Sequence, residues 1–187
     1  MPALLTSTAV VAVAEIGDKT QLLSLLLAAR YRRPLPIIAA ILLATIANHA
    51  LAAWIGDRIA AELGSQGLRW LLGISFSAIA VWALWPDRMD GEVHASARLG
   101  VFATSLLAFF LAEMGDKTQV ATVALAARYG DLYWVLVGTT LGMMCANVPA
   151  VLLGERVIRL CPMKYIRWLA AAIFAIVGVA AVVAPVA

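Results

Sequence analysis

Long apolar runs restrict this chain more than any other feature of its sequence. Each run has about 20 residues or more, enough for an α-helix to cross a hydrocarbon core about 30 Å thick. The chain is 64% hydrophobic and 13% charged, and a soluble fold could not bury that much apolar surface. The runs are continuous rather than alternating, which favours helices over a barrel. We therefore expect an all-α integral membrane protein with six transmembrane helices, at residues 4–29, 36–59, 68–85, 99–127, 132–157 and 165–183.

Basic residues between the spans indicate the orientation of the chain. Lys19 and Lys117 lie inside spans, and the remaining basic residues divide nine to three between the two sets of loops. The positive-inside rule places the richer set in the cytoplasm and both termini outside. These residues form no patch interleaved with aromatics, so we expect no nucleic-acid partner. The nine are Arg30, Arg32, Arg33, Arg88, Arg98, Arg156, Arg159, Lys164 and Arg167, and the three are Arg58, Arg69 and Arg128.

The two halves of the chain repeat one another at an offset of 98 residues. Residues 14–21 read AEIGDKTQ and residues 112–119 read AEMGDKTQ, so seven of eight positions are identical. We divide the chain into a first three-helix repeat at 1–88, a cytoplasmic linker at 89–98 and a second repeat at 99–187. Because three spans are an odd number, the second repeat is expected to be inverted in the membrane. Inverted repeats are typical of transporters whose site lies near the midplane.

Each repeat carries two acids near the middle of its first span. Glu15 and Asp18 are three residues apart, as are Glu113 and Asp116, a spacing that puts both carboxylates on one face of a continuous helix. One acid at the centre of a spanning helix costs about 2.5–3.5 kcal/mol, and such residues are functional by default. We predict that these four acids are the main ligands of a metal site.

Ion pairs within each motif are a purely structural alternative. Lys19 and Lys117 follow Glu15 and Glu113 by four residues, a spacing that allows salt bridges along a helix. Four carboxylates and two lysines still carry a net charge of −2. One divalent cation would neutralise that charge, and so would two protons in its absence. We therefore expect the lysines to be accessory charges beside the metal site.

Most polar side chains near the acids carry oxygen. Hard, six-coordinate oxygen sites suit Mg²⁺, Ca²⁺ and Mn²⁺, whereas Zn²⁺ and Cu²⁺ favour sulfur or imidazole. His49 could add a nitrogen that favours Mn²⁺ over Ca²⁺, although a buried histidine is more often a hydrogen-bonded core residue or a proton relay. The candidate additional ligands are Thr20, Gln21, Asn48, Thr118, Gln119 and Asn147.

Two pairs of residues allow a structural interpretation as well as a functional one. Gly17 and Gly115 lie between the acids of each motif, where the missing Cβ permits either a kink in the helix or close helix packing. Asn48 and Asn147 lie in the second span of each repeat. There an amide serves either as an ion ligand or in a hydrogen bond between helices, because an unsatisfied amide is costly in lipid. The sequence leaves both questions open.

The sequences EIGDKT and EMGDKT, one in each repeat, resemble the duplicated Glu-x-Gly-Asp-Lys/Arg-Thr/Ser signature of the GDT-type family of divalent-cation exporters. This family includes bacterial manganese exporters and organellar manganese/calcium transporters. The resemblance implies a secondary transporter that exports Mn²⁺, or also Ca²⁺, in exchange for protons. It assigns cation binding to Glu15, Asp18, Glu113 and Asp116. The metal is then a transported substrate rather than a resident cofactor, and we expect a multi-pass protein in the lipid bilayer of a bacterial inner membrane.

Two other classes of function compete with metal export. An exporter of a small organic cation or amino acid, of the lysine-efflux type, would have the same helix count, but its substrate needs an apolar pocket. We expect no enzyme, because the sequence has no H-E-x-x-H or G-x-S-x-G motif and its only histidines are His49 and His94. The sequence leaves open whether the chain forms a homo-oligomer.

Overall fold

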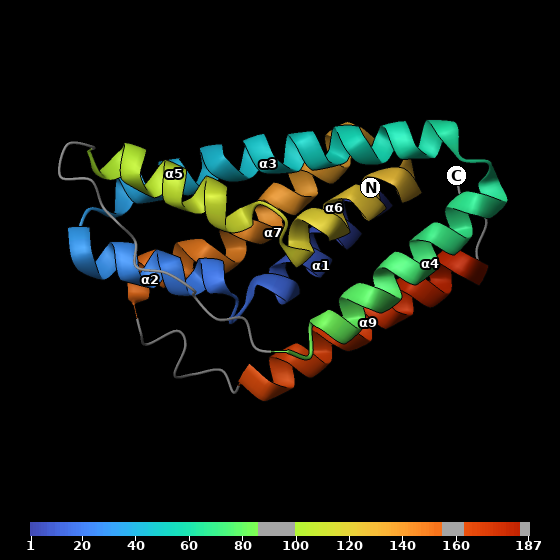
Figure 1. Ribbon diagram of the computed structural model, residues 1–187. Helices are drawn as coiled ribbons and strands as arrows, with labels where there is room; N and C mark the ends of the chain where they lie inside the picture. The colour runs from blue at the N-terminus through green and yellow to red at the C-terminus, as the bar shows by residue number, and fades with distance from the viewer. Residues whose placement is uncertain (86–99, 155–162, 184–187) are drawn as a thin grey trace.

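The computed structural model describes residues 1–85, 100–154 and 163–183, and the regular elements in these ranges are all α-helices (Figure 1). The linker predicted at 89–98 lies outside the described residues. The helices are α1 (Pro2–Glu15), α2 (Lys19–Tyr31), α3 (Pro34–Glu62), α4 (Ser65–Trp82), α5 (Val101–Glu113), α6 (Lys117–Tyr129), α7 (Leu132–Leu153) and α9 (Met163–Val183).

The first and fourth predicted spans are not continuous helices. The span at 4–29 divides into α1 and α2, and the span at 99–127 divides into α5 and α6. Gly17 and Gly115 lie at the two breaks with φ angles of +81° and +72°. This left-handed conformation is sterically strained for a residue that has a Cβ. A Cβ added to Gly115 would meet no atom within 4 Å. The kink interpretation is therefore confirmed, and close packing does not explain Gly115.

The lengths and apolar character of the helices agree with a membrane protein. Three described helices, α3, α7 and α9, are long and apolar enough to cross a bilayer. α1 and α5 are apolar but have only 14 and 13 residues, because each of them ends at an acidic motif.

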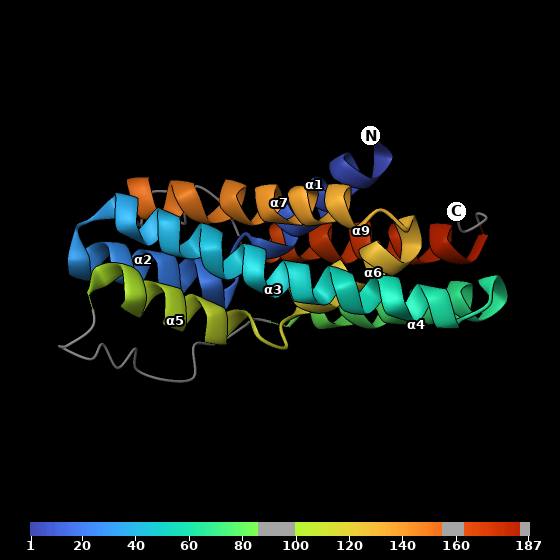
Figure 2. The same ribbon diagram turned by 90° about the horizontal axis from the view of Figure 1, so that it is seen from above.

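Helices pack in equivalent pairs from the two halves of the chain. α1 packs along α7, and α5 packs along α3, while α4 and α9 lie side by side (Figures 1 and 2). Gly138 and Gly142 bring α7 close to α1: an added Cβ would lie 2.7 Å from the carbonyl oxygen of Leu4 or of Thr8. Small residues that allow such approach are typical of helix contacts in lipid, where van der Waals packing replaces the hydrophobic effect.

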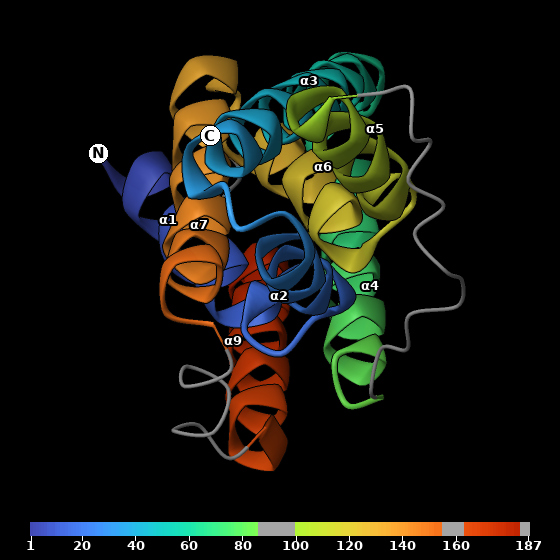
Figure 3. The same ribbon diagram turned by 90° about the vertical axis from the view of Figure 1, so that its left-hand side faces the viewer.

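The turns between helices gather at two opposite ends of the molecule. α1 begins and α9 ends at the same end as the α3–α4 and α6–α7 turns (Figures 1 and 2). The α2–α3 turn, the beginning of α5 and the end of α7 lie at the other end, which faces the viewer in Figure 3. The two helix breaks lie between these ends, so the acidic motifs are in the interior of the bundle.

Candidate functional site

Each acidic motif joins the end of one helix to the start of the next. Glu15 is the last residue of α1, and Asp18 is the N-cap of α2. Glu113 and Asp116 occupy the same positions at α5 and α6. The prediction that the two acids of a motif share one face of a continuous helix is therefore wrong, because the helix is interrupted at the glycine between them. All four acids are at most 1% exposed.

Three of these carboxylates meet across the two halves of the chain. Among the described residues, Glu15, Glu113 and Asp116 offer oxygens within 4.8 Å of one another. The hydroxyl of Thr20 donates to Glu15 Oε2 at 2.5 Å, and the hydroxyl of Thr118 donates to Glu113 Oε1 at 2.6 Å. Glu15 Oε1 and Glu113 Oε2 are buried and accept no hydrogen bond from any described residue. Buried oxygens without a partner are costly unless a cation or a proton satisfies them.

The lysines pair across the repeats rather than within them. Lys19 Nζ lies 3.0 Å from Asp116 Oδ1, and Lys117 Nζ donates to Asp18 Oδ1. The structural alternative of pairs with Glu15 and Glu113 along one helix is thus wrong, since the break at each glycine takes the lysine out of register with the glutamate. Each lysine instead binds the aspartate of the other motif, so the two ion pairs connect α2 to the α5–α6 break and α6 to the α1–α2 break.

Two glutamines stabilise the breaks. Gln21 Oε1 accepts a hydrogen bond from the Gly17 amide at 2.8 Å, and Gln119 Oε1 accepts one from the Gly115 amide at 2.7 Å. These bonds satisfy backbone donors that a continuous helix would have paired internally. Gln21 also donates to the Ala146 carbonyl of α7 at 3.0 Å, so both ends of its amide group are in use.

The two asparagines make hydrogen bonds between helices. Asn48 on α3 donates to the Phe110 carbonyl of α5 at 3.1 Å. Asn147 on α7 accepts from the Ser24 hydroxyl of α2 at 2.6 Å. Sequence reasoning did not single out Ser24. The repeat could have indicated Ser24, because the equivalent position of the second repeat, 98 residues further on, is also a hydroxyl residue, Thr122.

His49 lies beside the carboxylates. It is fully buried, and its Nε2 is 3.9 Å from Glu113 Oε1. Neither ring nitrogen makes a hydrogen bond with any described residue, so the core-histidine interpretation lacks the partner that it needs. The imidazole of His49 is therefore available as a nitrogen ligand at the edge of the carboxylate cluster.

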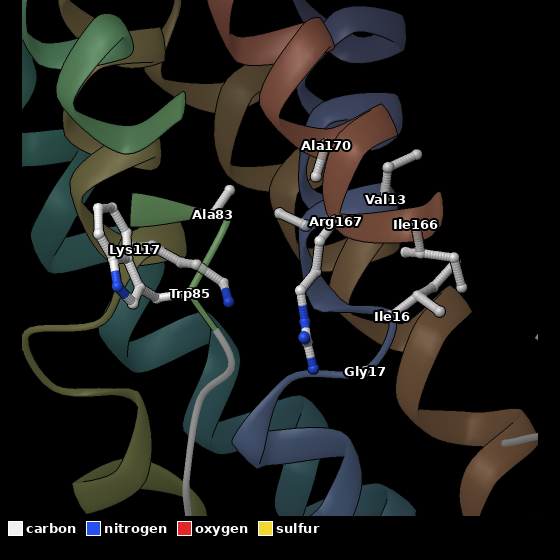
Figure 4. A pocket seen from close by; sticks show the side chains of 10 residues that line it. Val13, Ile16, Gly17, Ala83, Trp85, Lys117, Ile166, Arg167 and Ala170 are labelled. Atoms are coloured by element: carbon white, nitrogen blue, oxygen red, sulfur yellow. The ribbon is translucent and has the colours of Figure 1, made fainter. Parts of the chain in front are cut away.

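A small pocket adjoins the first motif (Figure 4). Val13 of α1 and Gly17 of the first motif line it, and Lys117 and Arg167 reach it from α6 and α9. Arg167 extends toward Gly17, and Lys117 approaches from the side of Trp85 (Figure 4). The pocket is large enough for about one water molecule, so little free space surrounds Lys117 there.

The site consists of buried carboxylates at two helix breaks, inside a bundle of apolar helices. This combination is typical of a membrane protein that transports ions. The family model "Divalent cation/proton antiporter GDT1" matches residues 3–91 and 101–186. The chain belongs to the GDT1 family, a family of transporters, and this assignment favours a metal-ion substrate over the lysine-efflux alternative.

Curated relatives extend over most of the chain. A Vibrio cholerae protein with the name "Putative manganese exporter" is 56% identical over 181 residues, which are 96% of this chain and 90% of the relative. GDT1-like protein 5 of Arabidopsis thaliana is 27% identical over 218 residues, covering 96% of this chain and 95% of the relative. No solved structure matches the chain.

Proposed function

We propose that this GDT1-family antiporter exports Mn²⁺ from the bacterial cytoplasm in exchange for protons, with Ca²⁺ as a second substrate. The observation that carries the proposal is the meeting of Glu15, Glu113 and Asp116 within 4.8 Å, together with the two buried glutamate oxygens that lack a hydrogen bond from any described residue. The name of the Vibrio cholerae relative supports Mn²⁺ as the metal.

Two inverted three-helix repeats, at 1–88 and 99–187, would carry this site, with the cytoplasmic linker at 89–98 between them. The two separate family matches, at 3–91 and 101–186, support this division. The equivalent helix pairs α1–α7 and α5–α3 support the repeat. In the proposed topology, α1 with α2 and α5 with α6 each form one broken span, six spans cross the inner membrane, and both termini lie outside.

The proposed ligands are Glu15, Glu113 and the two motif aspartates, with the neighbouring polar residues in supporting positions. Thr20 and Thr118 orient the glutamates through their hydroxyl groups. Hydrogen bonds to a ligating carboxylate are a normal part of metal sites and affect affinity strongly. The amide side chains of Gln21, Gln119, Asn48 and Asn147 support the helix breaks and the contacts between helices.

The donor set favours Mn²⁺ among the hard divalent cations. Carboxylate oxygens bind Mg²⁺, Ca²⁺ and Mn²⁺ alike, but imidazole nitrogen is a better ligand for transition metals. His49 Nε2 is close enough to Glu113 to join the coordination sphere after a small movement. Mg²⁺, which gives up its water reluctantly, is disfavoured in a site this enclosed.

Exchange with protons follows from the charge of the site. Four carboxylates and two lysines sum to −2, which one divalent cation balances in the loaded carrier. A carrier that returned empty would carry this charge through the membrane at high cost. Two protons on the carboxylates remove it, so metal moves one way and protons move the other.

Uptake into proteoliposomes tests the proposal. We expect Mn²⁺ to be transported when a pH gradient is imposed, Ca²⁺ more weakly, and Mg²⁺ least. The double variant Glu15→Gln with Glu113→Gln should lose transport while the protein still inserts, because amides keep the shape and lower the insertion cost. Transport of Mn²⁺ that is unaffected by the pH gradient, or by this double variant, would contradict the proposal.

A further inference from the structure

The two motif aspartates lie in different surroundings although their sequences are nearly identical. Asp116 belongs to the group of carboxylates with oxygens within 4.8 Å, and Asp18 does not. Asp18 is held by Lys117, whose side chain is 6% exposed, whereas the partner of Asp116 is Lys19, whose side chain is 26% exposed. Asp18 is thus enclosed together with Lys117. Asp116 lies in the carboxylate group, and its partner Lys19 is exposed enough to move away.

The helices around the two motifs also pack unequally. α6 packs against α4, and α1 packs against α9, but the corresponding pairs α2–α9 and α5–α4 do not pack to the same extent. Lys117 therefore lies in the pocket between the ends of α1, α4 and α9 (Figure 4). Lys19, its counterpart, is less covered. Two repeats with the same motif are held in two different arrangements within one molecule.

We propose that the two aspartates take turns as the third carboxylate ligand of the metal. The lysine of the opposite repeat encloses whichever aspartate is idle, while the lysine paired with the active aspartate withdraws when the metal binds. The present structure is one of the two arrangements: Asp116 lies with Glu15 and Glu113 and is paired with the partly exposed Lys19, while the buried Lys117 encloses Asp18. In the other arrangement Asp18 joins Glu15 and Glu113, and Lys19 encloses Asp116. This inference rests on the proposed function, because it assigns the idle and active ligands of that same site.

The physical basis is that both arrangements contain the same chemical groups. Seven of eight residues in the two motifs are identical, so exchanging the roles of the repeats replaces each ion pair by an equivalent one. A buried aspartate or lysine without a partner is costly, and therefore the idle aspartate must be paired at every stage. The lysines supply that partner from within the protein, which keeps the net charge of the site constant while the ligands change.

Paired variants of the full chain test the proposal. Asp18→Asn with Lys117→Met, and Asp116→Asn with Lys19→Met, each delete one ion pair without leaving a buried charge. Each should bind Mn²⁺ within about threefold of the wild-type protein, because one complete three-carboxylate arrangement remains. Each should fail to transport, because the other arrangement is incomplete. The variant with all four substitutions should bind at least about a hundredfold more weakly.

The control is two mismatched variants, in which the aspartate and the lysine that are replaced come from different ion pairs. Asp18→Asn with Lys19→Met, and Asp116→Asn with Lys117→Met, make the same kinds of substitution and the same change in net charge. They leave one lysine and one aspartate without their partners, so Mn²⁺ binding should fall at least about tenfold below that of the paired variants. Titration of the purified protein with Mn²⁺, followed by electron paramagnetic resonance of the free ion, measures all of these affinities.

Loss of binding in either paired variant to the level of the four-fold variant would overturn the proposal and leave a static carboxylate site, without affecting the proposed Mn²⁺ export. Mismatched variants that bind as well as paired ones, or a paired variant that transports at the wild-type rate, would also overturn it. Absence of Mn²⁺ binding and transport in the wild-type protein would instead defeat the proposed function. If a paired variant does not fold, Asp18→Cys with Lys117→Cys should cross-link with a short bifunctional thiol reagent, and failure to cross-link would overturn the pairing.

Discussion

Glu15 Oε1 and Glu113 Oε2 are the single atoms on which the proposed metal site most depends. Both are buried, and neither accepts a hydrogen bond from any described residue, while the second oxygen of each carboxylate is bound by a threonine. The threonines therefore fix the orientation of each carboxylate and leave one oxygen of each free to meet a cation.

We expect Glu15→Gln and Glu113→Gln each to weaken Mn²⁺ binding by about ten- to a hundredfold, because an amide supplies a neutral oxygen in place of an anionic one. Isothermal calorimetry on the purified variants measures the effect. Glu62→Gln, at the exposed end of α3, is the control and should bind as the wild-type protein does. Unequal losses at Glu15 and Glu113 would indicate that the two repeats do not share one site.

His49 allows a prediction about selectivity. Replacing it with leucine removes a nitrogen that lies 3.9 Å from Glu113 Oε1 and keeps an apolar side chain of similar size. Mn²⁺ affinity should fall by about tenfold while Ca²⁺ affinity stays close to its wild-type value, since imidazole favours transition metals. Competition between the two ions in a binding titration measures this ratio. An equal loss for both ions would show that His49 supports the fold of the site instead.

At the scale of elements, the helix breaks decide where the acids lie. The Gly115 φ angle of +72° is available to glycine without strain. The hydrogen bond from its amide to Gln119 then stabilises the break. The break separates α5 from α6, so that Glu113 is the last residue of one helix and Asp116 is the N-cap of the next.

Gly115→Ala should therefore destabilise the break by about 1–2 kcal/mol, because a Cβ is strained at positive φ. An added Cβ would meet no atom within 4 Å, so any effect must come from the backbone conformation rather than from a clash. Thermal unfolding and Mn²⁺ transport should both be reduced. Gly100→Ala is the control, since its added Cβ is equally free and its φ is −65°; equal effects at both positions would contradict the argument.

At the scale of the whole molecule, the charge balance predicts a dependence on pH. Carboxylates bind a metal only when they are deprotonated, so protons compete with Mn²⁺ for the same oxygens. Mn²⁺ binding should release protons and should weaken as pH falls between about pH 8 and pH 6. Calorimetry in buffers of different ionisation enthalpy counts the released protons. Binding that displaces no proton would favour a uniporter or a sodium-coupled carrier.

The proposed orientation of the chain is also testable. The α3–α4 turn should face the outside and the α2–α3 turn the cytoplasm, because the basic loops are expected inside. Ser65→Cys, at the start of α4 beside the first of these turns, should react with a membrane-impermeant thiol reagent added to intact cells. Arg33→Cys, in the second, should react only after the cells are opened. Both positions are exposed, and the reverse pattern would invert the topology.

Much of this architecture follows from the sequence alone. Apolar length placed helices at 36–59, 132–157 and 165–183. Apart from Gly154, the described residues of these ranges lie in α3, α7 and α9. The duplicated motif pointed to the acids and to the family, and the family match confirms that assignment. These features are local or periodic, so the order of residues is enough to reveal them. The assignment of metal ligands stays a prediction.

Only the tertiary structure decided how the motif residues pair. A spacing of four residues favoured Glu15 with Lys19 on one helix, yet Lys19 binds Asp116 and Lys117 binds Asp18. The glycine at each break removes the helical register on which the spacing argument rests. The lysine partners are then set by which helices pack together, at a separation of 97 or 99 residues along the chain. Contacts at that separation depend on the packing of α1, α2, α5 and α6 around the breaks, which no local pattern in the sequence encodes.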